Sequence, residues 1–397
     1  MRVVYLHTAS PVSHFGITIL AGSRFERKNE IGLAHFLEHC LFKGTKKRKA
    51  FHILSRLDAV GGELNAFTSK EELCVYASYS KEYTKRAIEL IADISINSTF
   101  PVKEIEKEKE IIFDEINSYM DAPSDKIFDD FEEFLFKNHA LGNNILGNKK
   151  SLINFTADDL SNYVKRQFNT SNCIISFVGD IAIDKFKKLI EKEFKSFPIL
   201  TKEIKIDPFL NYQPFNHRKK EANYQNHLII GGIAPGFKNE DRVGLSLLIN
   251  LLGGPALNSR LILSIREKFG YAYNIEANYT SYLDVGFWTI YVGCDQKFLN
   301  KTIKLVNKEL KLLCDKHLSK SQLDKTKQQM KGHIALNMDS NSGMMLSMGK
   351  SMLVYDKIYN VEEMHNEIDA VTSDDLCRIA NKYLNPSNSS SLIFDLK

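Results

Sequence analysis

Two histidines and a glutamate fall within five residues of an otherwise apolar stretch, at His35, Glu38 and His39. Residues four apart on an α-helix leave the same face about one turn from each other, so the two imidazoles could share one small cation. Glu38 lies on the shoulder of that face. The order H-x-x-E-H is typical of zinc sites of the inverted zincin kind, mirror-ordered relative to H-E-x-x-H. The simpler alternative is that both rings only pack in the core among leucines and phenylalanines.

A further candidate ligand lies on a highly charged helix that the sequence predicts over 102–116. Glu108 and Glu115 are seven residues apart there, almost two turns, so both carboxylates point the same way. Most acids on such a helix face solvent. Glu115 differs because isoleucines and Phe113 surround it in the sequence, and a carboxylate that leaves water needs a cationic partner. A bound metal would be such a partner.

The elements around these motifs are a mixture of strands and helices. The predicted strands are 3–6, 15–21, 64–68, 73–79 and 173–179, and the predicted helices include 50–60, 83–97 and segments that end near 168 and 195. The same order then repeats at a constant offset, because 32–35, 68–69 and 75–79 match 244–247, 280–281 and 287–291. This pattern predicts an internal duplication of roughly 200 residues.

The duplication predicts two homologous domains, 1–205 and 223–397, joined by a polar, proline-containing linker at 206–222. In the second copy, the positions of the histidine motif hold Leu247, Asn250 and Leu251, which form no zinc site. We therefore expect one domain to hold a cation and the other to contribute walls and polar contacts.

Composition limits the partners and the compartment. A net charge of +4, from 53 basic and 49 acidic residues spread along the chain, singles out neither nucleic acid nor an anionic membrane. The six cysteines are scattered without a C-x-x-C pair, which indicates reduced thiols and a cytoplasmic or organelle-matrix protein. The sequence contains no run of 18 apolar residues. We expect a soluble, non-exported protein with no nucleic-acid or membrane partner.

The motif residues closely resemble those of the zinc peptidase family that includes pitrilysin, insulin-degrading enzyme and the mitochondrial processing peptidase, in particular its short, two-domain branch. In that family H-x-x-E-H gives both histidine ligands and the catalytic glutamate, and the third ligand is a glutamate that follows at a characteristic interval. Counted from His39, that interval leads to Glu115. The resemblance therefore implies that His35, His39 and Glu115 bind Zn²⁺ and that Glu38 is catalytic. It implies that Glu108 is an acid near the metal that does not bind it.

Two further segments resemble the same family. The sequence G-G-E-L-N-A at 61–66 is similar to its G-G-x-x-N-A strand, whose edge pairs with an extended peptide, which implies that Asn65 and Ala66 bind substrate. The segment 263–273 is similar to the one that carries an arginine and a tyrosine seven residues apart, which places this pair at Arg266 and Tyr273. Tyr271 competes for the tyrosine role, and an ordinary structural role for all three side chains is the alternative.

The resemblance implies an α+β fold with two homologous domains, each an antiparallel-type β-sheet flanked by α-helices. It implies a zinc-dependent endopeptidase that hydrolyses peptides or unfolded segments bound as an added β-strand inside a dimeric chamber. Glu38 would move the proton of the attacking water, and Arg266 and Tyr273 would donate hydrogen bonds to the substrate carbonyl. A homodimer is expected, with a heterodimer as the other possibility. The competing hypotheses are a non-catalytic peptide-binding or assembly subunit of the same fold and, more weakly, a hydrolase of small non-peptide substrates.

Overall fold

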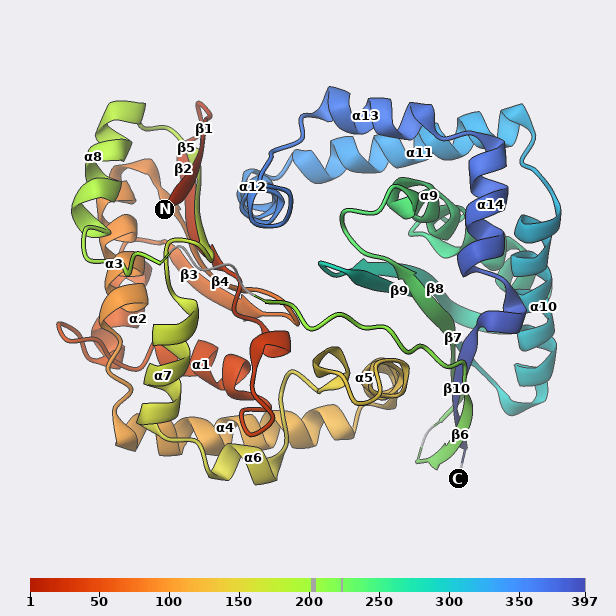
Figure 1. The fold of residues 1–397 in the computed structure, drawn as a ribbon, viewed down its shortest axis with the longest axis horizontal. Helices are drawn as coiled ribbons and strands as arrows, with labels where there is room; N and C mark the ends of the chain where they lie inside the picture. The colour runs from red at the N-terminus through yellow and green to blue at the C-terminus, as the bar shows by residue number, and fades with distance from the viewer. Residues whose placement is uncertain (201–204, 223, 397) are drawn as a thin grey trace. The chain divides into compact units, whose positions relative to one another are not determined.

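The computed structural model describes residues 1–200, 205–222 and 224–396 and divides the chain into two compact units. Unit 1 consists of Met1–Asn117, Asn143–Ile206 and Asn337–Ile358, and unit 2 consists of Ser118–Gly142, Asp207–Leu336 and Tyr359–Lys397. Each unit contains one five-stranded sheet with helices packed against it, which confirms the predicted α+β fold class (Figure 1). Residues 201–204, 223 and 397, which fall within the two predicted domains, lie outside the described residues.

The sheet of unit 1 has one parallel pair of strands, at one edge. Its strands are β1 (Arg2–His7), β2 (Val12–Ile19), β3 (Glu63–Thr68), β4 (Leu73–Ser80) and β5 (Cys173–Gly179). Their order across the sheet is β1-β5-β2-β4-β3. β1 and β5 pair in parallel and the other neighbours pair antiparallel, so the predicted antiparallel character holds for three of the four pairings. β3 is the outermost strand at the other edge.

Helices cover both faces of this sheet. The helices of unit 1 are α1 (Leu33–Leu41), α2 (Ala50–Asp58), α3 (Thr84–Asn97), α4 (Val102–Met120), α6 (Lys149–Ile153), α7 (Ala157–Gln167), α8 (Ile183–Glu193) and α12 (Asn341–Tyr355). Successive side chains of a strand point to opposite faces. Ile175 and Phe177 of β5 accordingly enter the main core with α1, α3, α7 and α8, whereas Ile174 and Val178 contact α12.

The sheet of unit 2 repeats this topology. Its strands are β6 (Asn216–Glu221), β7 (Asn226–Pro235), β8 (Ala272–Ser281), β9 (Val285–Cys294) and β10 (Ser390–Leu396). Their order is β6-β10-β7-β9-β8, which is the order of unit 1 with each strand replaced by its counterpart. The parallel pair again lies at one edge, here between β6 and β10. The two sheets therefore have the common topology that an internal duplication predicts.

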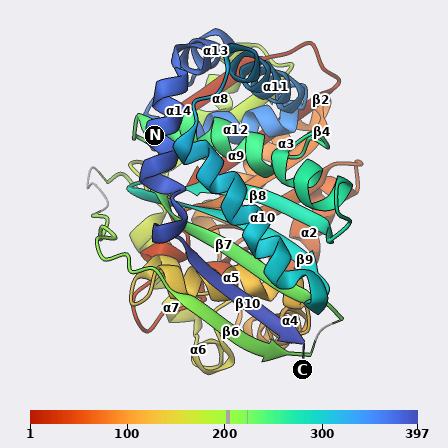
Figure 2. The same ribbon diagram turned by 90° about the vertical axis from the view of Figure 1, so that its right-hand side faces the viewer.

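The helices of unit 2 also lie on both faces of their sheet. They are α5 (Pro123–Leu135), α9 (Asp241–Gly253), α10 (Gln296–Asp315), α11 (Lys320–Met338), α13 (Val361–Ala370) and α14 (Ser373–Tyr383). Side chains of α9, α10 and α14 share one core with the strands, and Figure 2 shows α10 and α14 crossing in front of them. α5 packs on the other face through Ile127, Phe131 and Leu135.

Short helices and one π-helix complete the fold. The 3₁₀-helices lie at Ser23–Phe25, Lys81–Tyr83, Ala140–Gly142 and Pro386–Asn388, and the π-helix lies at Ile262–Glu267. Within the ranges that the structure describes, no helix combines the length and the apolar composition needed to cross a membrane.

Two helices each pack against the sheet of the other predicted domain. α5 lies within the range 1–205 but contacts β7 and β10 of unit 2, and α12 lies within 223–397 but contacts β2 and β5 of unit 1. The units are therefore discontinuous in sequence, unlike the predicted domains. The predicted linker at 206–222 also differs, because its latter part forms the edge strand β6. Edge strands commonly carry charged side chains. The charged composition of this segment therefore resembles that of a linker, and the strand was not predicted.

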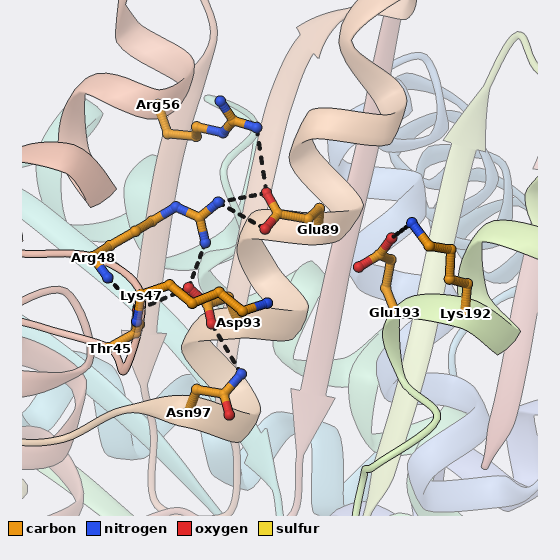
Figure 3. A network of polar contacts seen from close by, with 9 residues as sticks. All are labelled: Thr45, Lys47, Arg48, Arg56, Glu89, Asp93, Asn97, Lys192 and Glu193. Atoms are coloured by element: carbon orange, nitrogen blue, oxygen red, sulfur yellow. Dashed lines mark hydrogen bonds and ion pairs between the residues drawn. The ribbon is translucent and has the colours of Figure 1, made fainter.

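A polar network fastens the segment that follows α1 to α3 (Figure 3). Arg48 donates hydrogen bonds of 2.7 Å to both carboxylate oxygens of Glu89 and also donates to Asp93. Asp93 is 3% exposed and accepts further bonds from Thr45 at 2.8 Å and from Asn97 at 2.9 Å. A buried carboxylate is stable only with such donors, so this network fixes the chain that leaves the carboxyl end of α1.

Candidate metal centre

The amino end of α1 is held by a carboxylate and by a close contact between two glycines. Glu26 accepts hydrogen bonds from the backbone amides of Gly32, at 3.0 Å, and Ala34, at 2.7 Å, and Ala34 lies in the first turn, whose amides have no acceptor inside the helix. Gly32 has a φ of +94°, and a Cβ at this position would lie 2.7 Å from the Cα of Gly147. Only glycine fits there. The helix therefore starts at a defined place, one residue before Ala34 and two before His35.

The structure brings His35, His39 and Glu115 together. The rings of His35 and His39 lie on one face of α1 with their centroids 4.7 Å apart. Glu115 reaches them from α4, with Oε1 at 3.8 Å from Nε2 of His35 and Oε2 at 3.7 Å from Nε2 of His39. One ligand atom from each residue lies within 4.8 Å of the other two. The side chain of Glu115 is 43% exposed, so the cluster is open to solvent on the side of α4.

These three side chains fit a zinc ion. Zinc binds imidazole nitrogen and carboxylate oxygen at about 2.1 Å in tetrahedral geometry, which places neighbouring ligand atoms about 3.4 Å apart. The observed separations need only a small closing movement. Burial and the neighbouring His39 lower the pKa of His35 to about 4, so this ring is neutral at pH 7 and offers a lone pair. Its Nδ1 is buried without a hydrogen-bond partner among the described residues, which leaves Nε2 as the atom that faces Glu115.

Glu108 supports His39 from the side opposite to Glu115. Glu108 is 3% exposed, and its carboxylate lies 3.3 Å from Nδ1 of His39. It also forms an ion pair with Lys43, whose Nζ lies 2.7 Å from Oε1. Burial alone would raise the pKa of Glu108, but the contacts with His39 and Lys43 outweigh it and hold the pKa below its usual range. A carboxylate that accepts a hydrogen bond from the Nδ1–H group of a histidine leaves the Nε2 lone pair of the same ring free to bind a metal.

Glu38 lies on the same helix, one residue before His39, and is partly buried. Burial raises the pKa of its carboxyl group, and the charge of Glu115 acts in the same direction. A carboxylate whose pKa is raised in the direction of 7 is suited to accept a proton and to return it at neutral pH. Asn65 and Ala66 lie on β3, the strand at the sheet edge, and α1 packs against this strand. The structure therefore gathers Glu38, the three possible ligands and a strand edge within unit 1.

Arg266 and Tyr273 lie in unit 2, where they contact each other. Arg266 belongs to the π-helix, and its guanidinium carbon lies 4.4 Å from the centroid of the Tyr273 ring. Tyr273 is 80% exposed. Tyr271, the competing tyrosine, instead stacks between Phe269 and Phe298, with ring centroids 5.1 and 4.7 Å away. The exposed tyrosine that accompanies Arg266 is therefore Tyr273.

Sequence reasoning missed two residues of this region, Glu26 and Lys43. Glu26 lies eight residues before the amide of Ala34 that it binds, and no capping spacing connects the two. Lys43 lies beyond the end of α1 and meets Glu108 only because α1 and α4 are neighbours in space. The sequence carried no signal for Lys43, because the burial of Glu108, which demands a cation, is known only from the structure.

Two solved structures share this fold. A crystal structure of a peptidase M16 inactive domain from Pseudomonas fluorescens matches all of this chain and 96% of its own, with a TM-score of 0.92 and 18% sequence identity. The crystal structure of a protease from Helicobacter pylori matches 99% of this chain and 96% of its own, with a TM-score of 0.87 and 22% identity. At these identities the comparison establishes the fold.

Sequence relatives establish the family. A protein of Bacillus subtilis named "Uncharacterized zinc protease YmxG" is 34% identical over 95% of this chain and 92% of its own length. A Rickettsia bellii protein named "Uncharacterized zinc protease" is 30% identical over 96% of this chain and 92% of its own. The pattern described as "Insulinase (Peptidase family M16)" matches residues 2–149, and the one described as "Peptidase M16 inactive domain" matches residues 154–330. Sequence relatives and family patterns agree that the chain belongs to the insulinase family of peptidases, family M16.

Proposed function

We propose that this protein is a zinc-dependent endopeptidase whose metal is held by His35, His39 and Glu115. The observation that carries the proposal is the convergence of two imidazole Nε2 atoms and one carboxylate, from two helices, on a single point. Glu108 supports it, because a buried carboxylate behind a metal-binding histidine is the usual partner of such a ligand. The relatives named zinc proteases agree with this choice of metal.

The chemistry needs a proton carrier and donors for the substrate carbonyl. Zinc, when bound, supplies a Lewis acid that polarises a carbonyl and makes water more acidic. Glu38 accepts the proton of the attacking water and delivers it to the leaving amine. Arg266 and Tyr273 donate hydrogen bonds to the carbonyl oxygen as it gains negative charge. These roles follow the sequence resemblance and use groups that are exposed or partly buried.

The substrate in this proposal is an extended peptide or an unfolded segment. β3 is the outer strand of its sheet, so the backbone groups on its free side are available to an added strand. Asn65 is exposed on this strand, and Ala66 follows it. Backbone pairing is indifferent to most side chains, so the sequence tolerance of cleavage is broad. A homodimer, with the metal unit of one copy facing the Arg266 unit of the other, would enclose such a substrate.

The test compares metal content with peptide cleavage on the purified chain. We expect about one zinc per chain, and we expect Glu38→Gln to keep the zinc but to lose cleavage of an unstructured peptide. Asp114→Asn, which removes a charge from an exposed position next to Glu115, is the matched control and retains both. A zinc-free protein, or undiminished cleavage by Glu38→Gln, would reject the proposal. Zinc-free protein that still binds the peptide would instead support the non-catalytic subunit.

A further inference from the structure

Unit 2 contains a pocket that has no part in the proposed reaction. It has a volume of about 470 Å³ and lies between the segment around the start of the π-helix, the end of α10 and the start of α11. Its lining consists of Arg260, Leu263, Ser264, Glu309, Leu312, Lys316, His317, Leu318 and Gln322. This volume falls in the range of small-molecule sites, which combine apolar walls with a few convergent polar groups. π-Helical turns, such as the one that supplies Leu263 and Ser264, are frequent at functional sites.

Two of the lining residues form a loose ion pair. Nη1 of Arg260 lies 4.0 Å from Oε2 of Glu309, and the two side chains are only 22% and 16% exposed. Burial lowers the pKa of Arg260 and raises the pKa of Glu309, so their mutual attraction does not repay the loss of water around either group. At 4.0 Å the pair lacks a direct hydrogen bond, and both groups keep hydrogen-bonding capacity for a ligand.

The remaining lining includes a cationic side chain, a polar side chain and three leucines. Lys316 is exposed at the carboxyl end of α10 and forms no ion pair with any described residue. Gln322 uses its side-chain oxygen to accept from the amide of Ser319, which leaves its NH₂ group as a donor. The apolar part of the lining consists of three leucines, of which Leu263 is 49% exposed. The lining therefore combines positive charge and hydrogen-bond donors with hydrocarbon.

We propose that this pocket binds the free carboxyl end of a short peptide with an apolar last residue. The planar fork of Arg260 matches a carboxylate in two-point geometry, and Lys316 adds a second positive charge. The last peptide N–H of such a ligand donates to Glu309, and its apolar side chain lies against Leu263, Leu312 and Leu318. Binding exchanges the loose Arg260–Glu309 pair for two direct interactions. A fatty acid would satisfy Arg260 and the leucines but would leave Glu309 without a donor.

The experiment is a ligand-observed NMR titration of the full-length protein with three probes. N-acetyl-leucine carries the carboxylate, the N–H and the apolar side chain, N-acetyl-leucinamide lacks the charge, and octanoate lacks the N–H. None of the three probes contains a peptide bond between two amino acids, which is the bond that the proposed endopeptidase cleaves. The result is therefore independent of catalysis. We expect saturable binding of N-acetyl-leucine with a Kd of about 1 mM, as befits a ligand of this size, and at least tenfold weaker binding of the amide.

Variants locate the binding in the pocket. Arg260→Gln is expected to weaken N-acetyl-leucine at least tenfold, and Lys316→Gln to weaken it about threefold. Glu309→Gln removes the competing partner of Arg260 and is expected to strengthen binding severalfold, which a merely structural role for Glu309 does not produce. Lys311→Gln is the control, because Lys311 is exposed on α10 but does not line the pocket.

Several outcomes overturn the proposal. They are the absence of saturable binding by N-acetyl-leucine, equal binding of its amide, and binding that survives Arg260→Gln in a folded variant. Octanoate that binds tighter than N-acetyl-leucine would assign the pocket to a fatty acid instead and would likewise overturn the peptide assignment. If Arg260→Gln does not fold, the opposite shifts expected for Lys316→Gln and Glu309→Gln decide the question.

Discussion

The carboxylate of Glu26 lies 2.7 Å from the backbone amide of Ala34, the residue directly before His35. Burial raises the pKa of Glu26 to about 8, although the hydrogen bonds from the amides of Ala34 and Gly32 oppose this shift. The carboxyl oxygens stabilise the helix because they accept hydrogen bonds from amides that have no acceptor inside it. Glu26 contributes no atom to the metal cluster, yet it fixes the turn from which His35 projects. Its carboxylate links the loop before α1 to the position of a proposed zinc ligand.

Replacing Glu26 with alanine should therefore loosen the metal centre as well as the fold. We expect a loss of about 1–2 kcal/mol in the free energy of unfolding, as for other helix caps, and a weaker zinc affinity in chelator competition. Glu30→Gln is the matched control, because Glu30 lies in the same loop but pairs with Arg166 at 2.6 Å. Equal changes in zinc affinity for both variants would show that Glu26 acts on stability alone.

Removing Glu108 should weaken zinc binding without removing a ligand. We expect Glu108→Ala to lower the zinc affinity roughly 10- to 100-fold, the usual effect of losing the hydrogen-bond partner of a metal-binding histidine. Lys43→Met leaves Glu108 in place and should have a smaller effect. Glu110→Ala, an exposed change on the same helix, is the control. An unchanged affinity in Glu108→Ala would mean that the contact with Nδ1 of His39 does not orient the ring.

Asp241 should make the stability of unit 2 depend on acid pH. Burial by itself would raise the pKa of Asp241, but hydrogen bonds from Lys382, Arg378 and Tyr383 outweigh it and hold the pKa below its usual range. Because the folded pKa is the lower one, the carboxylate stabilises the fold above the unfolded pKa of about 3.9, and this contribution disappears as the pH falls through the folded pKa.

The measurement is urea unfolding followed by the fluorescence of Trp288, the sole tryptophan, which is fully buried in β9 of unit 2. We expect Asp241→Asn to lower the free energy of unfolding by about 2 kcal/mol at pH 7 and the difference from wild type to shrink below pH 4. Asp374→Asn, on the same helix as Arg378 but 91% exposed, should change little. A difference that is constant down to pH 3 would contradict the assigned pKa.

The contact of α12 with the sheet of unit 1 should be sensitive to one methyl group. A Cβ at Gly349 would lie 2.9 Å from Oγ1 of Thr18 and 3.1 Å from Oγ of Ser176, both buried. We expect Gly349→Ala to destabilise unit 1 by about 1–3 kcal/mol through overpacking, measured as faster hydrogen exchange in β2 and β5. Gly343→Ala on the same helix meets nothing closer than 3.5 Å and should be neutral or stabilising. Similar exchange in both variants would place α12 away from this sheet.

The sequence predicts the parts of this protein that local spacing determines. His35 and His39 are one helical turn apart, and Glu115 shares a face with Glu108, so their orientations follow from the helical period. The duplication predicts that the two sheets share one strand order, but the order itself comes from the structure. The prediction that Glu115 is removed from water is weaker, because its side chain is 43% exposed and meets the histidines at an open edge.

The remaining features depend on which surfaces meet in space. The apolar pattern of α12 shows that it must be covered, but Met345 and Met348 fit any apolar sheet face and do not specify the sheet of unit 1. The same holds for α5 and its phenylalanines. β6 is concealed for a different reason, because a charged edge strand and a charged loop have the same composition.

The packing of α12 on the sheet of unit 1 also affects the order in which the chain can fold during synthesis. The last strand of the unit 1 sheet ends at Gly179 and α12 ends at Tyr355, so nearly half of the chain is translated between them. At about 5–20 residues per second, the ribosome needs roughly 10 to 35 s to supply this helix. Until then the apolar side chains of Ile174 and Val178, which α12 covers in the folded protein, are exposed to water or bound by a chaperone. The amino-terminal half therefore completes its fold only when the carboxyl-terminal half is nearly finished.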